Sequence, residues 1–237
     1  MIKKIFKTYL VPTLTIVISL VFGLVFKNDF LSILTLIVGF LNSYYMAIGK
    51  WYNYIYGLVF SITYGLICAF NGLYGWSVFA ILFYIPSQVM GMINWRKNNE
   101  NDVVKMRSFS FKISLIVCLS VIIGSTIFGY LLSLIPSQQL SFLDGTTQIV
   151  NVCGIILSLL RFREAWYVWL INNVLDLSIW IINLINGTQN AEMMFITSLM
   201  YLVMNVIGVI CWIKIERVQS KNQSNKLIDK EKLANYN

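Results

Sequence analysis

The chain has 237 residues, of which 58% are hydrophobic and only 12% are charged, and its mean hydropathy is +0.72. This apolar share is far above that of soluble domains, so the composition excludes a soluble protein and indicates a polytopic membrane protein. The net charge of +8 would suggest a nucleic-acid partner in a soluble protein, but here the placement of the charges decides its meaning.

Eight apolar windows are long enough to cross a bilayer, because a helix needs roughly 20 residues to span ~30 Å of hydrocarbon. They cover residues 9–26, 30–48, 54–72, 74–95, 112–134, 139–160, 165–186 and 190–213. The first window follows three lysines, as in a signal peptide, but it is long and lacks a small-residue cleavage pattern. We therefore predict an all-α protein with eight transmembrane helices, the first of them uncleaved.

The basic residues gather on one side of this predicted topology. All 18 lysines and arginines except Lys27 fall in the termini or in the loops on the same side as the termini. The positive-inside rule then predicts a multi-pass protein of the plasma membrane with both termini cytoplasmic. Because the charge reports topology, we expect no nucleic-acid partner.

Two parts of the chain can be aligned with each other. The offset is 115 residues over the first two helices of each part and 117 over the third. The aligned pairs are Asp29 and Asp144, Gly39 and Gly154, Ser43 and Ser158, Trp51 and Trp166, Gly72 and Gly187, and the frame Tyr84, Gln88, Gly91, Trp95 with Tyr201, Asn205, Gly208, Trp212. A single helix between the copies gives both the same orientation. We predict an extra first helix followed by a three-plus-one-plus-three parallel repeat, the plan of the sugar-carrying SWEET proteins.

This repeat divides the chain into five parts. Residues 1–28 hold the N-terminus and the extra helix, 29–95 the first three-helix repeat, and 96–138 a basic cytoplasmic loop with the linker helix. Residues 139–213 hold the second repeat. Residues 214–237 form a polar, basic cytoplasmic tail, of which we expect the part from Gln219 onward to be disordered.

One face of the window 165–186 is polar and aromatic. At 100° per residue, Trp166, Trp169, Asn173, Asp176 and Trp180 lie within an arc of ~80°. Asp176 is the one ionisable side chain in the middle of a predicted span. Because an intramembrane carboxylate is costly, Asp176 is a functional candidate.

Four amides from four helices are expected at one depth. Counted at ~1.5 Å per residue from the cytoplasmic helix ends, they lie roughly 10–12 Å deep. Transporters with parallel repeats bind substrate between the repeats, near the midplane. The four amides are Asn42, Gln88, Asn173 and Asn205. Together with Trp166, Trp169, Asp176 and Tyr201 they are the candidate substrate-binding residues. We expect no metal site and no cofactor.

Structural interpretations compete at several positions. Trp95 and Trp212 border the basic side and are interpreted as interfacial belt residues, while Trp166 is divided between belt and binding site. Buried amides also form interhelical hydrogen bonds in membrane proteins. Asp29 and Asp144 lie near outer helix starts and are predicted to be N-caps.

Three segments resemble the PnuC family of vitamin transporters. They are AIGKWYNYIYGLV (residues 47–59), FYIPSQVMGMINWRK (83–97) and REAWYVWLINN (163–173), the last with a Trp-x2-Trp-x3-Asn frame. The likeness covers about residues 29–215. It implies a three-plus-one-plus-three fold and the uptake of nicotinamide riboside by facilitated diffusion with alternating access. A cytosolic kinase then traps the substrate for NAD synthesis, and Trp166, Trp169 and Asn173 hold it during transport. A homotrimer is the expected assembly, in contact with membrane lipid.

The substrate within this family stays open at this stage. Related branches carry thiamine, riboflavin or deoxynucleosides, and this chain has Asn151 and Ile155 where the family often has a small hydroxyl residue and a glutamine. Indoles attract a desolvated cation by ~2 kcal/mol, and Asp176 adds a counter-ion. Both favour a flat cation such as nicotinamide riboside or thiamine over neutral ligands.

Other classes of function make different demands. A membrane enzyme is disfavoured, because the chain has no histidine and no paired intramembrane carboxylates for acid–base chemistry. Proton coupling through Asp176 stays open. A structural or assembly protein without a ligand also stays open, and it predicts no thermal stabilisation by small molecules.

Overall fold

The computed structural model describes residues 2–25, 29–70, 78–100, 102–136, 140–187 and 191–234. Within these ranges lie eight α-helices, a π-helical segment and a two-stranded hairpin. Their bounds are α1 Ile2–Val25, α2 Phe30–Ala47, α3 Asn53–Phe70, η1 Ala80–Tyr84, α5 Ile85–Lys97, β1 Asn99–Glu100, β2 Val103–Val104, α6 Phe111–Ser133, α7 Ser141–Leu159, α8 Ala165–Ile185 and α9 Ala191–Ala234.

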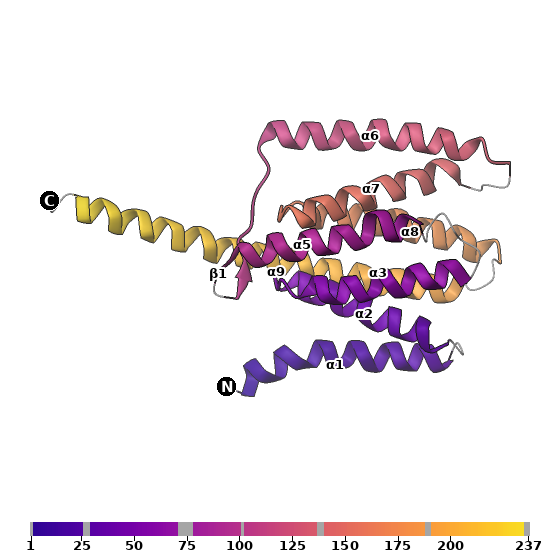
Figure 1. Ribbon diagram of the computed structural model, residues 1–237, viewed down its shortest axis with the longest axis horizontal. Helices are drawn as coiled ribbons and strands as arrows, with labels where there is room; N and C mark the ends of the chain where they lie inside the picture. Colours follow the sequence, from indigo (N-terminus) through magenta and orange to yellow (C-terminus); the bar gives the residue numbers. More distant parts are fainter. Residues whose placement is uncertain are drawn as a thin grey trace.

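Every predicted window contains a helix, so the all-α prediction is confirmed. The helices run along one common axis, and both chain ends lie at the same end of the bundle (Figure 1). Five stretches, in α2, α6, α7, α8 and α9, are long and apolar enough to cross a membrane, and two shorter apolar helices lie in α1 and α3. Lys27 and Gly72, which entered the topology and repeat predictions, lie outside the described residues.

Six helices form a closed ring. Around it, α2 packs on α3, α3 on α5, α5 on α7, α7 on α8, α8 on α9, and α9 on α2. We call α2, α3 and η1–α5 the first triplet and α7, α8 and α9 the second triplet. Outside the ring, α1 packs on α2 and α6 packs on α7. Helix α1, predicted to be an extra helix, therefore packs on the first helix of the first triplet, just as the linker helix α6 packs on the first helix of the second triplet.

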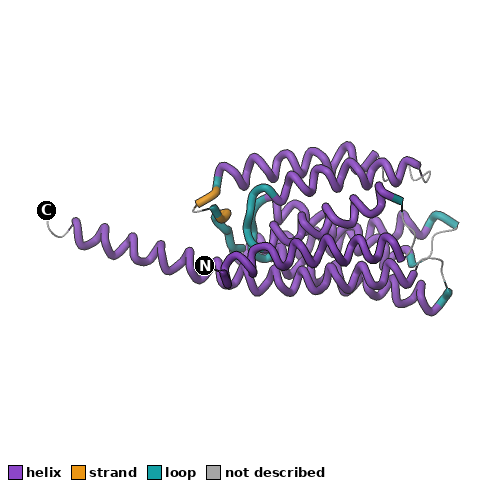
Figure 2. Tube along the Cα trace, turned by 90° about the horizontal axis from the view of Figure 1, so that it is seen from below, coloured by secondary structure: helices purple, strands orange, loops and turns teal. Residues whose placement is uncertain are grey.

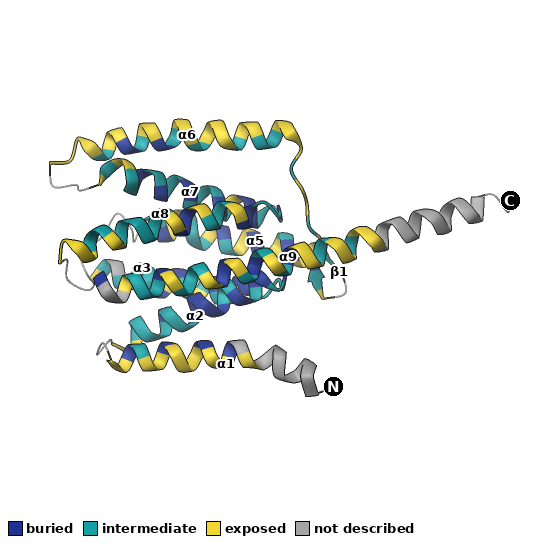
Figure 3. Ribbon diagram, turned by 180° about the vertical axis from the view of Figure 1, so that it is seen from behind, coloured by how far each residue is buried: buried dark blue, intermediate teal, exposed yellow. Residues whose placement is uncertain are grey.

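The two outer helices expose most of their apolar side chains. Figure 3 shows α1 and α6 largely in the colour of exposed residues. On α6 these include Leu115, Ile116, Leu119, Ile122, Ile123 and Ile127. Such a continuous apolar surface is unfavourable in water and suits contact with lipid.

The two triplets share one loop geometry, at the ends of α2 and α7. Gly49 and Arg161 both have positive φ, of 72° and 68°. Just after each of them, the amide of Lys50 donates to Tyr45 O and that of Phe162 to Leu157 O, as in a Schellman helix ending. Gly49 and Arg161 lie 112 positions apart in the chain, and so do the starts of α3 and α8.

The predicted offset of 115 is therefore wrong over the first two helices of each triplet. It paired Trp51 with Trp166, but Trp51 packs beneath the guanidinium of Arg96, 5.3 Å from its ring centroid. With the offset of 112, Tyr54 corresponds to Trp166. A few identical aspartate, glycine, serine and tryptophan residues misled the alignment. The left-handed position that fixes the register is a glycine in one loop and an arginine in the other, so it did not contribute a match.

The segment 103–107 connects the two loops. The amide of Val104 donates to Gly49 O and that of Arg107 to Arg161 O, each at 2.9 Å. Gln219 of α9 also holds this segment, since its amide group donates to Val104 O and accepts from the Met106 N–H. We call this end of the bundle the basic end, because it carries Lys50, Arg96, Arg107, Arg161 and Arg163.

The C-terminal tail is helical, which corrects the prediction of disorder. Helix α9 continues to Ala234 and projects beyond the bundle as a single rod (Figure 2). After Gly208 the sequence up to Ala234 contains neither glycine nor proline, so no helix breaker interrupts the backbone hydrogen bonds. The tail has few apolar residues, which suggested disorder, but a helix that is surrounded by solvent has the same composition.

A π-helical turn precedes Pro86. Pro86 is the second residue of α5, and η1 precedes it directly. The Ile85 N–H bonds to Ala80 O, one residue farther back than in an α-helix. A proline has no N–H and crowds the preceding turn, which such a bulge accommodates.

Candidate functional site

A cavity of about 530 Å³ lies inside the ring of six helices. Among the described residues, every lining side chain comes from the two triplets or the loops between their helices. All eight predicted site residues line it: Asn42, Gln88, Trp166, Trp169, Asn173, Asp176, Tyr201 and Asn205. Its volume falls within the range of ~300–1,000 Å³ of small-molecule sites.

The α8 wall is held in place by hydrogen bonds. The Trp169 indole N–H donates to Ser158 Oγ at 2.9 Å, and the Trp180 indole N–H donates to Asp176 Oδ1 at 3.2 Å. The Ser198 hydroxyl donates to the other oxygen of Asp176. The carboxylate is therefore oriented by two donors while it lines the cavity.

The predicted amide layer is divided into bonded and unbonded groups. The Asn42 side chain donates to Asn53 O at 2.9 Å, and the Asn205 side chain donates to Trp169 O at 3.4 Å. Gln88 Oε1 and Asn173 Nδ2 are buried without a partner among the described residues. Buried amide atoms are nearly always hydrogen-bonded, so these two atoms suit a polar ligand or water in the cavity.

Glycine at position 57 leaves the space for this amide layer. A Cβ built on Gly57 would lie 2.5 Å from Asn42 Nδ2 and 2.7 Å from Gln88 Cδ. Such distances are shorter than van der Waals contact, so any side chain here would displace one of the amides. Gly57 itself lines the cavity.

One wall of the cavity was not among the predicted site residues, although Asn151 and Ile155 were noted as family positions. Helix α7 contributes Asp144, Gln148, Asn151, Ile155 and Ser158, spaced as one helical face. This periodicity was readable in the sequence. The α7 face was not assigned to the site because the predicted site consisted of amides and aromatic residues near the midplane. Asp144 in particular was predicted to be a helix cap.

The two predicted N-caps differ in the structure. Asp29 caps α2, since its Oδ1 accepts the Ser32 N–H at 2.7 Å, and the hydrogen bonds from Ser32 lower the pKa of this carboxyl group. Asp144 is not a cap. Helix α7 starts at Ser141 after Leu140, which places Asp144 inside the first turn, facing the cavity.

Trp95 and Trp212 are not belt residues, which corrects their interpretation. Both are at most 2% exposed. Trp95 of the first triplet donates from its indole to Ser158 O at 2.8 Å, and Trp212 of the second triplet donates to Met46 O at 3.1 Å. Each indole reaches a carbonyl near the end of the opposite triplet's first helix. A buried indole N–H needs an acceptor, and last-turn carbonyls have no partner within their own helix.

These tryptophans form the core of an aromatic cluster that closes the basic end. The ring centroids of Trp95 and Trp212 are 5.8 Å apart, and those of Trp166 and Trp212 are 5.9 Å apart. Tyr54 packs edge-on against Trp95 at 5.2 Å. The cavity therefore ends at this cluster on the basic side.

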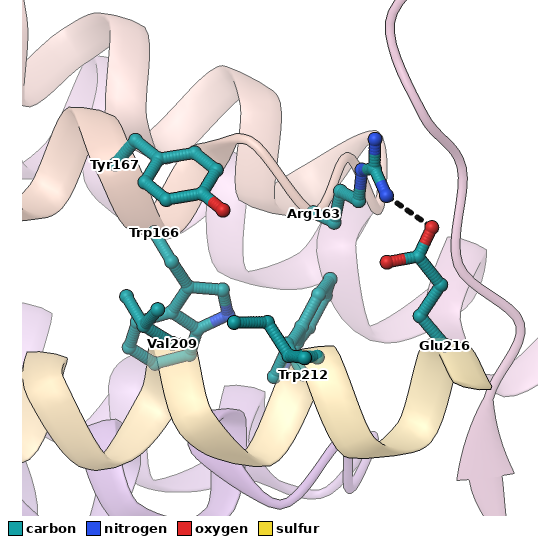
Figure 4. Close-up of a pocket in the computed structure, with 7 residues that line it drawn as sticks. Arg163, Trp166, Tyr167, Val209, Trp212 and Glu216 are labelled. Atoms are coloured by element: carbon teal, nitrogen blue, oxygen red, sulfur yellow. Dashed lines mark hydrogen bonds and ion pairs between the residues drawn. The ribbon is translucent and has the colours of Figure 1, made fainter. Parts of the chain in front are cut away.

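A second pocket, of about 20 Å³, is lined by Trp166, Tyr167 and Trp212 among others (Figure 4). It holds about one water molecule and is too small for an organic substrate. Its rim carries the ion pair of Arg163 with Glu216, which joins the loop before α8 to α9. Together with Glu164, Glu216 raises the pKa of the Arg163 guanidinium.

The charge of the large cavity has one sign. Its walls include two carboxylates, Asp144 and Asp176, and among the described residues no lysine or arginine. The chain has 18 lysines and arginines, so this exclusion is marked. In a cavity of low polarity, such a wall favours cations and disfavours anions.

Comparisons with known proteins place the chain in a family. A model of the family described as nicotinamide mononucleotide transporter matches residues 29–214. The nicotinamide riboside transporter PnuC of Neisseria mucosa is 29% identical over 203 residues, which cover 83% of this chain and 77% of that protein. The PnuC of Haemophilus influenzae is 30% identical over 159 residues, 65% of this chain and 69% of that protein.

A solved structure agrees with these matches. The crystal structure of the vitamin B3 transporter PnuC superimposes with a TM-score of 0.69 at 27% identity, covering 86% of this chain and 88% of that chain. With its apolar helices, the chain is a multi-pass membrane protein. It belongs to the nicotinamide mononucleotide transporter family, which comprises transporters of the PnuC type and not enzymes.

Proposed function

We propose that this protein takes up nicotinamide riboside. The observation that carries the proposal is the cavity, with its indoles, amides and two carboxylates and with no lysine or arginine among its described walls. The relatives from Neisseria mucosa and Haemophilus influenzae are named as nicotinamide riboside transporters, which supports the same substrate here.

The chemistry of the cavity matches the parts of this substrate. The pyridinium ring carries a fixed positive charge, which suits the indole faces of Trp166 and Trp169 and the carboxylate of Asp176. The ribose hydroxyls and the carboxamide suit the amide groups of Gln88 and Asn173. Of these, Gln88 Oε1 and Asn173 Nδ2 lack a partner among the described residues. In this assignment Asn42, Tyr201 and Asn205 complete the site.

The same charges argue for the riboside over the mononucleotide that gives the family its description. A phosphate group carries up to two negative charges and is normally held by arginine, lysine or a helix N-terminus. The described cavity walls offer no such cation, and they place two carboxylates there instead. We therefore expect the mononucleotide to be excluded.

The proposed mechanism is facilitated diffusion with alternating access. The two triplets act as a parallel three-plus-one-plus-three repeat that rocks around the central cavity. The basic end is cytoplasmic in this proposal, as the positive-inside rule requires, and the protein works as a homotrimer in the plasma membrane. A cytosolic kinase traps the imported riboside by phosphorylation. This keeps the concentration gradient of nicotinamide riboside directed inward and supplies NAD synthesis.

Thiamine is the second candidate substrate. It is also flat and cationic, so the indoles and carboxylates favour it for the same physical reason. It lacks a ribose, and the unpartnered amides of Gln88 and Asn173 therefore favour nicotinamide riboside over it.

A binding titration of the purified protein tests the proposal. We expect nicotinamide riboside to bind more tightly than thiamine, riboflavin, deoxynucleosides and nicotinamide mononucleotide, and to raise the melting temperature. Uptake into proteoliposomes without an ion gradient then tests facilitated diffusion. Stabilisation by none of these ligands would support the structural-protein interpretation instead.

A further inference from the structure

A polar stripe on α7 runs from the first turn of this helix to the closed end of the cavity. Asp144, Gln148 and Asn151 all line the cavity, and Ser158, on the same face, holds the Trp169 indole. Gln148 Nε2 lies 3.5 Å from Asp144 Oδ1. The stripe starts in the first turn of α7, at the end of the bundle opposite the basic end.

The two cavity carboxylates lie at different depths. Asp144 is three residues from the start of α7, and Asp176 is nine residues from the end of α8, which lies at the same end of the bundle. At ~1.5 Å per residue, Asp176 is deeper by about 9 Å. A solute that enters from the end opposite the basic end passes Asp144 first.

The deeper part of the cavity carries an independent sign of a ligand. Asn172 and Asn173 are 9% and 5% exposed, and Asn172 Oδ1 and Asn173 Nδ2 have no partner among the described residues. Both residues line the cavity, about one helical turn before Asp176. Polar atoms that are buried and unpaired in this way indicate a place for a polar solute.

The corresponding face of α2 has no such stripe. With the register of 112 set by the two loops, Asp144 corresponds to Ser32, Gln148 to Leu36 and Asn151 to Gly39. The acidic residue of α2, Asp29, lies at the same end of the bundle but caps its helix and is not among the cavity residues. Among the described cavity residues, the carboxylate at this end of the bundle therefore comes from α7 and has no counterpart on α2.

We infer that Asp144 is a charge-selecting residue at the outer entrance of the cavity, which attracts a cationic substrate and passes it to Asp176. This inference rests on the proposed function and adds a specificity-determining residue to it. Asp144 acts on the charge of the substrate through the field of its carboxylate, so its effect depends on ionic strength.

The test compares two forms of one substrate. Nicotinamide riboside is a cation, and its reduced dihydro form has the same ribose and carboxamide without the charge. Initial uptake into proteoliposomes is measured for both forms, at low and at high salt, with the wild-type protein and with Asp144→Asn, Asp144→Glu and Asp29→Asn. Asp29→Asn removes the same charge at the same end of the bundle while keeping a residue suited to capping.

For Asp144→Asn we expect the kcat/KM for the cation to fall by about three- to tenfold at low salt, less at high salt, with the dihydro form unaffected. Asp144→Glu should restore the wild-type ratio, and Asp29→Asn should leave both substrates unchanged. Equal losses for both forms would overturn the inference, as would no loss for either or an equal effect of Asp29→Asn. If the wild-type protein carries neither form, the proposed function fails, and this inference fails with it.

Discussion

The two triplets have the same backbone plan and different contents. Each begins with a helix that ends at a left-handed residue, Gly49 or Arg161. Each ends with a helix whose tryptophan, Trp95 or Trp212, donates to a carbonyl of the other triplet. The two triplets therefore use matching contacts to hold the bundle together.

Inside the cavity the two triplets no longer match. With the loop register, Gly57 of α3 corresponds to Trp169 of α8, and Ser32 of α2 corresponds to Asp144 of α7. The second triplet supplies the indoles and carboxylates, while the first supplies Asn42 and Gln88 around the space left by Gly57. The comparison teaches that the two triplets share packing contacts but differ in the residues that line the cavity, and such a cavity suits an asymmetric ligand.

The largest effect is expected from making the first triplet resemble the second. Gly57→Trp places an indole where the amides of Asn42 and Gln88 lie, and we expect the affinity for nicotinamide riboside to fall by more than about 100-fold. Gly65→Ala is the matched control on α3, since its Cβ would meet only Ala80 Cβ, at 3.2 Å. Isothermal titration measures the affinity. Unchanged binding by Gly57→Trp in a folded protein would remove the first triplet from the site.

The next effect comes from removing an indole of the second triplet. Trp169→Leu eliminates the aromatic face and the hydrogen bond to Ser158. We expect the affinity for the cation to drop by about 30-fold, corresponding to a desolvated cation–π contact of ~2 kcal/mol. Trp169→Phe should recover part of this loss. Tyr167→Leu, on the same helix but half exposed, serves as the control, and an equal loss there would show that α8 is merely perturbed.

The matching contacts should respond differently from the cavity. Trp95→Phe leaves the buried Ser158 carbonyl without its indole donor, so we expect the free energy of unfolding to fall by about 1–2 kcal/mol. The ratio of affinities for nicotinamide riboside and thiamine should stay unchanged. Trp212→Phe should behave alike, because its bond to Met46 is the counterpart. Thermal denaturation in detergent and ligand titration measure the two quantities, and a changed ratio would place these residues in the binding site.

The smallest effects concern the left-handed loop positions. Gly49→Ala introduces a Cβ at positive φ, 2.9 Å from Val103 Cγ1, and we expect it to cost about 1 kcal/mol of stability or somewhat more. Arg161→Gly should change stability by less than about 0.5 kcal/mol. The relief of the backbone is offset by loss of the side-chain bond to Lys105 O. Melting temperatures of the two variants measure both effects, and a loss of stability in Arg161→Gly as large as that in Gly49→Ala would show that the two loops are not equivalent.

The sequence was sufficient for the helices and for one face of the site. Long apolar runs have no other stable form in a bilayer than helices or barrels, and the periodicity of Trp166, Trp169 and Asn173 defines one face of α8 independently of any neighbour. The role of Trp95 was not accessible in this way. A tryptophan near basic residues looks the same whether its N–H meets water or a carbonyl of another helix.

Register was the other failure, and it had a physical cause. The predicted alignment rested on a few identical residues, among them Trp51 and Trp166, whereas the geometry that fixes the register lies in the loop backbone. A left-handed residue is recognisable as Gly49 but not as Arg161. The α7 stripe, by contrast, was visible in the spacing of Asp144, Gln148 and Asn151.

The segment 103–107 has a mechanical consequence. Its amides bind the loops of both triplets, so the two rigid halves are joined at the basic end. A rotation of about 10° around this joint would separate the far tips of helices ~27 Å long by about 5 Å without breaking a bond. Separation of the two triplets at the basic end would first have to break the hydrogen bonds that the Val104 and Arg107 amides donate to the two loops. The rate at which these two amide protons exchange with deuterated solvent would therefore report how often the joint opens.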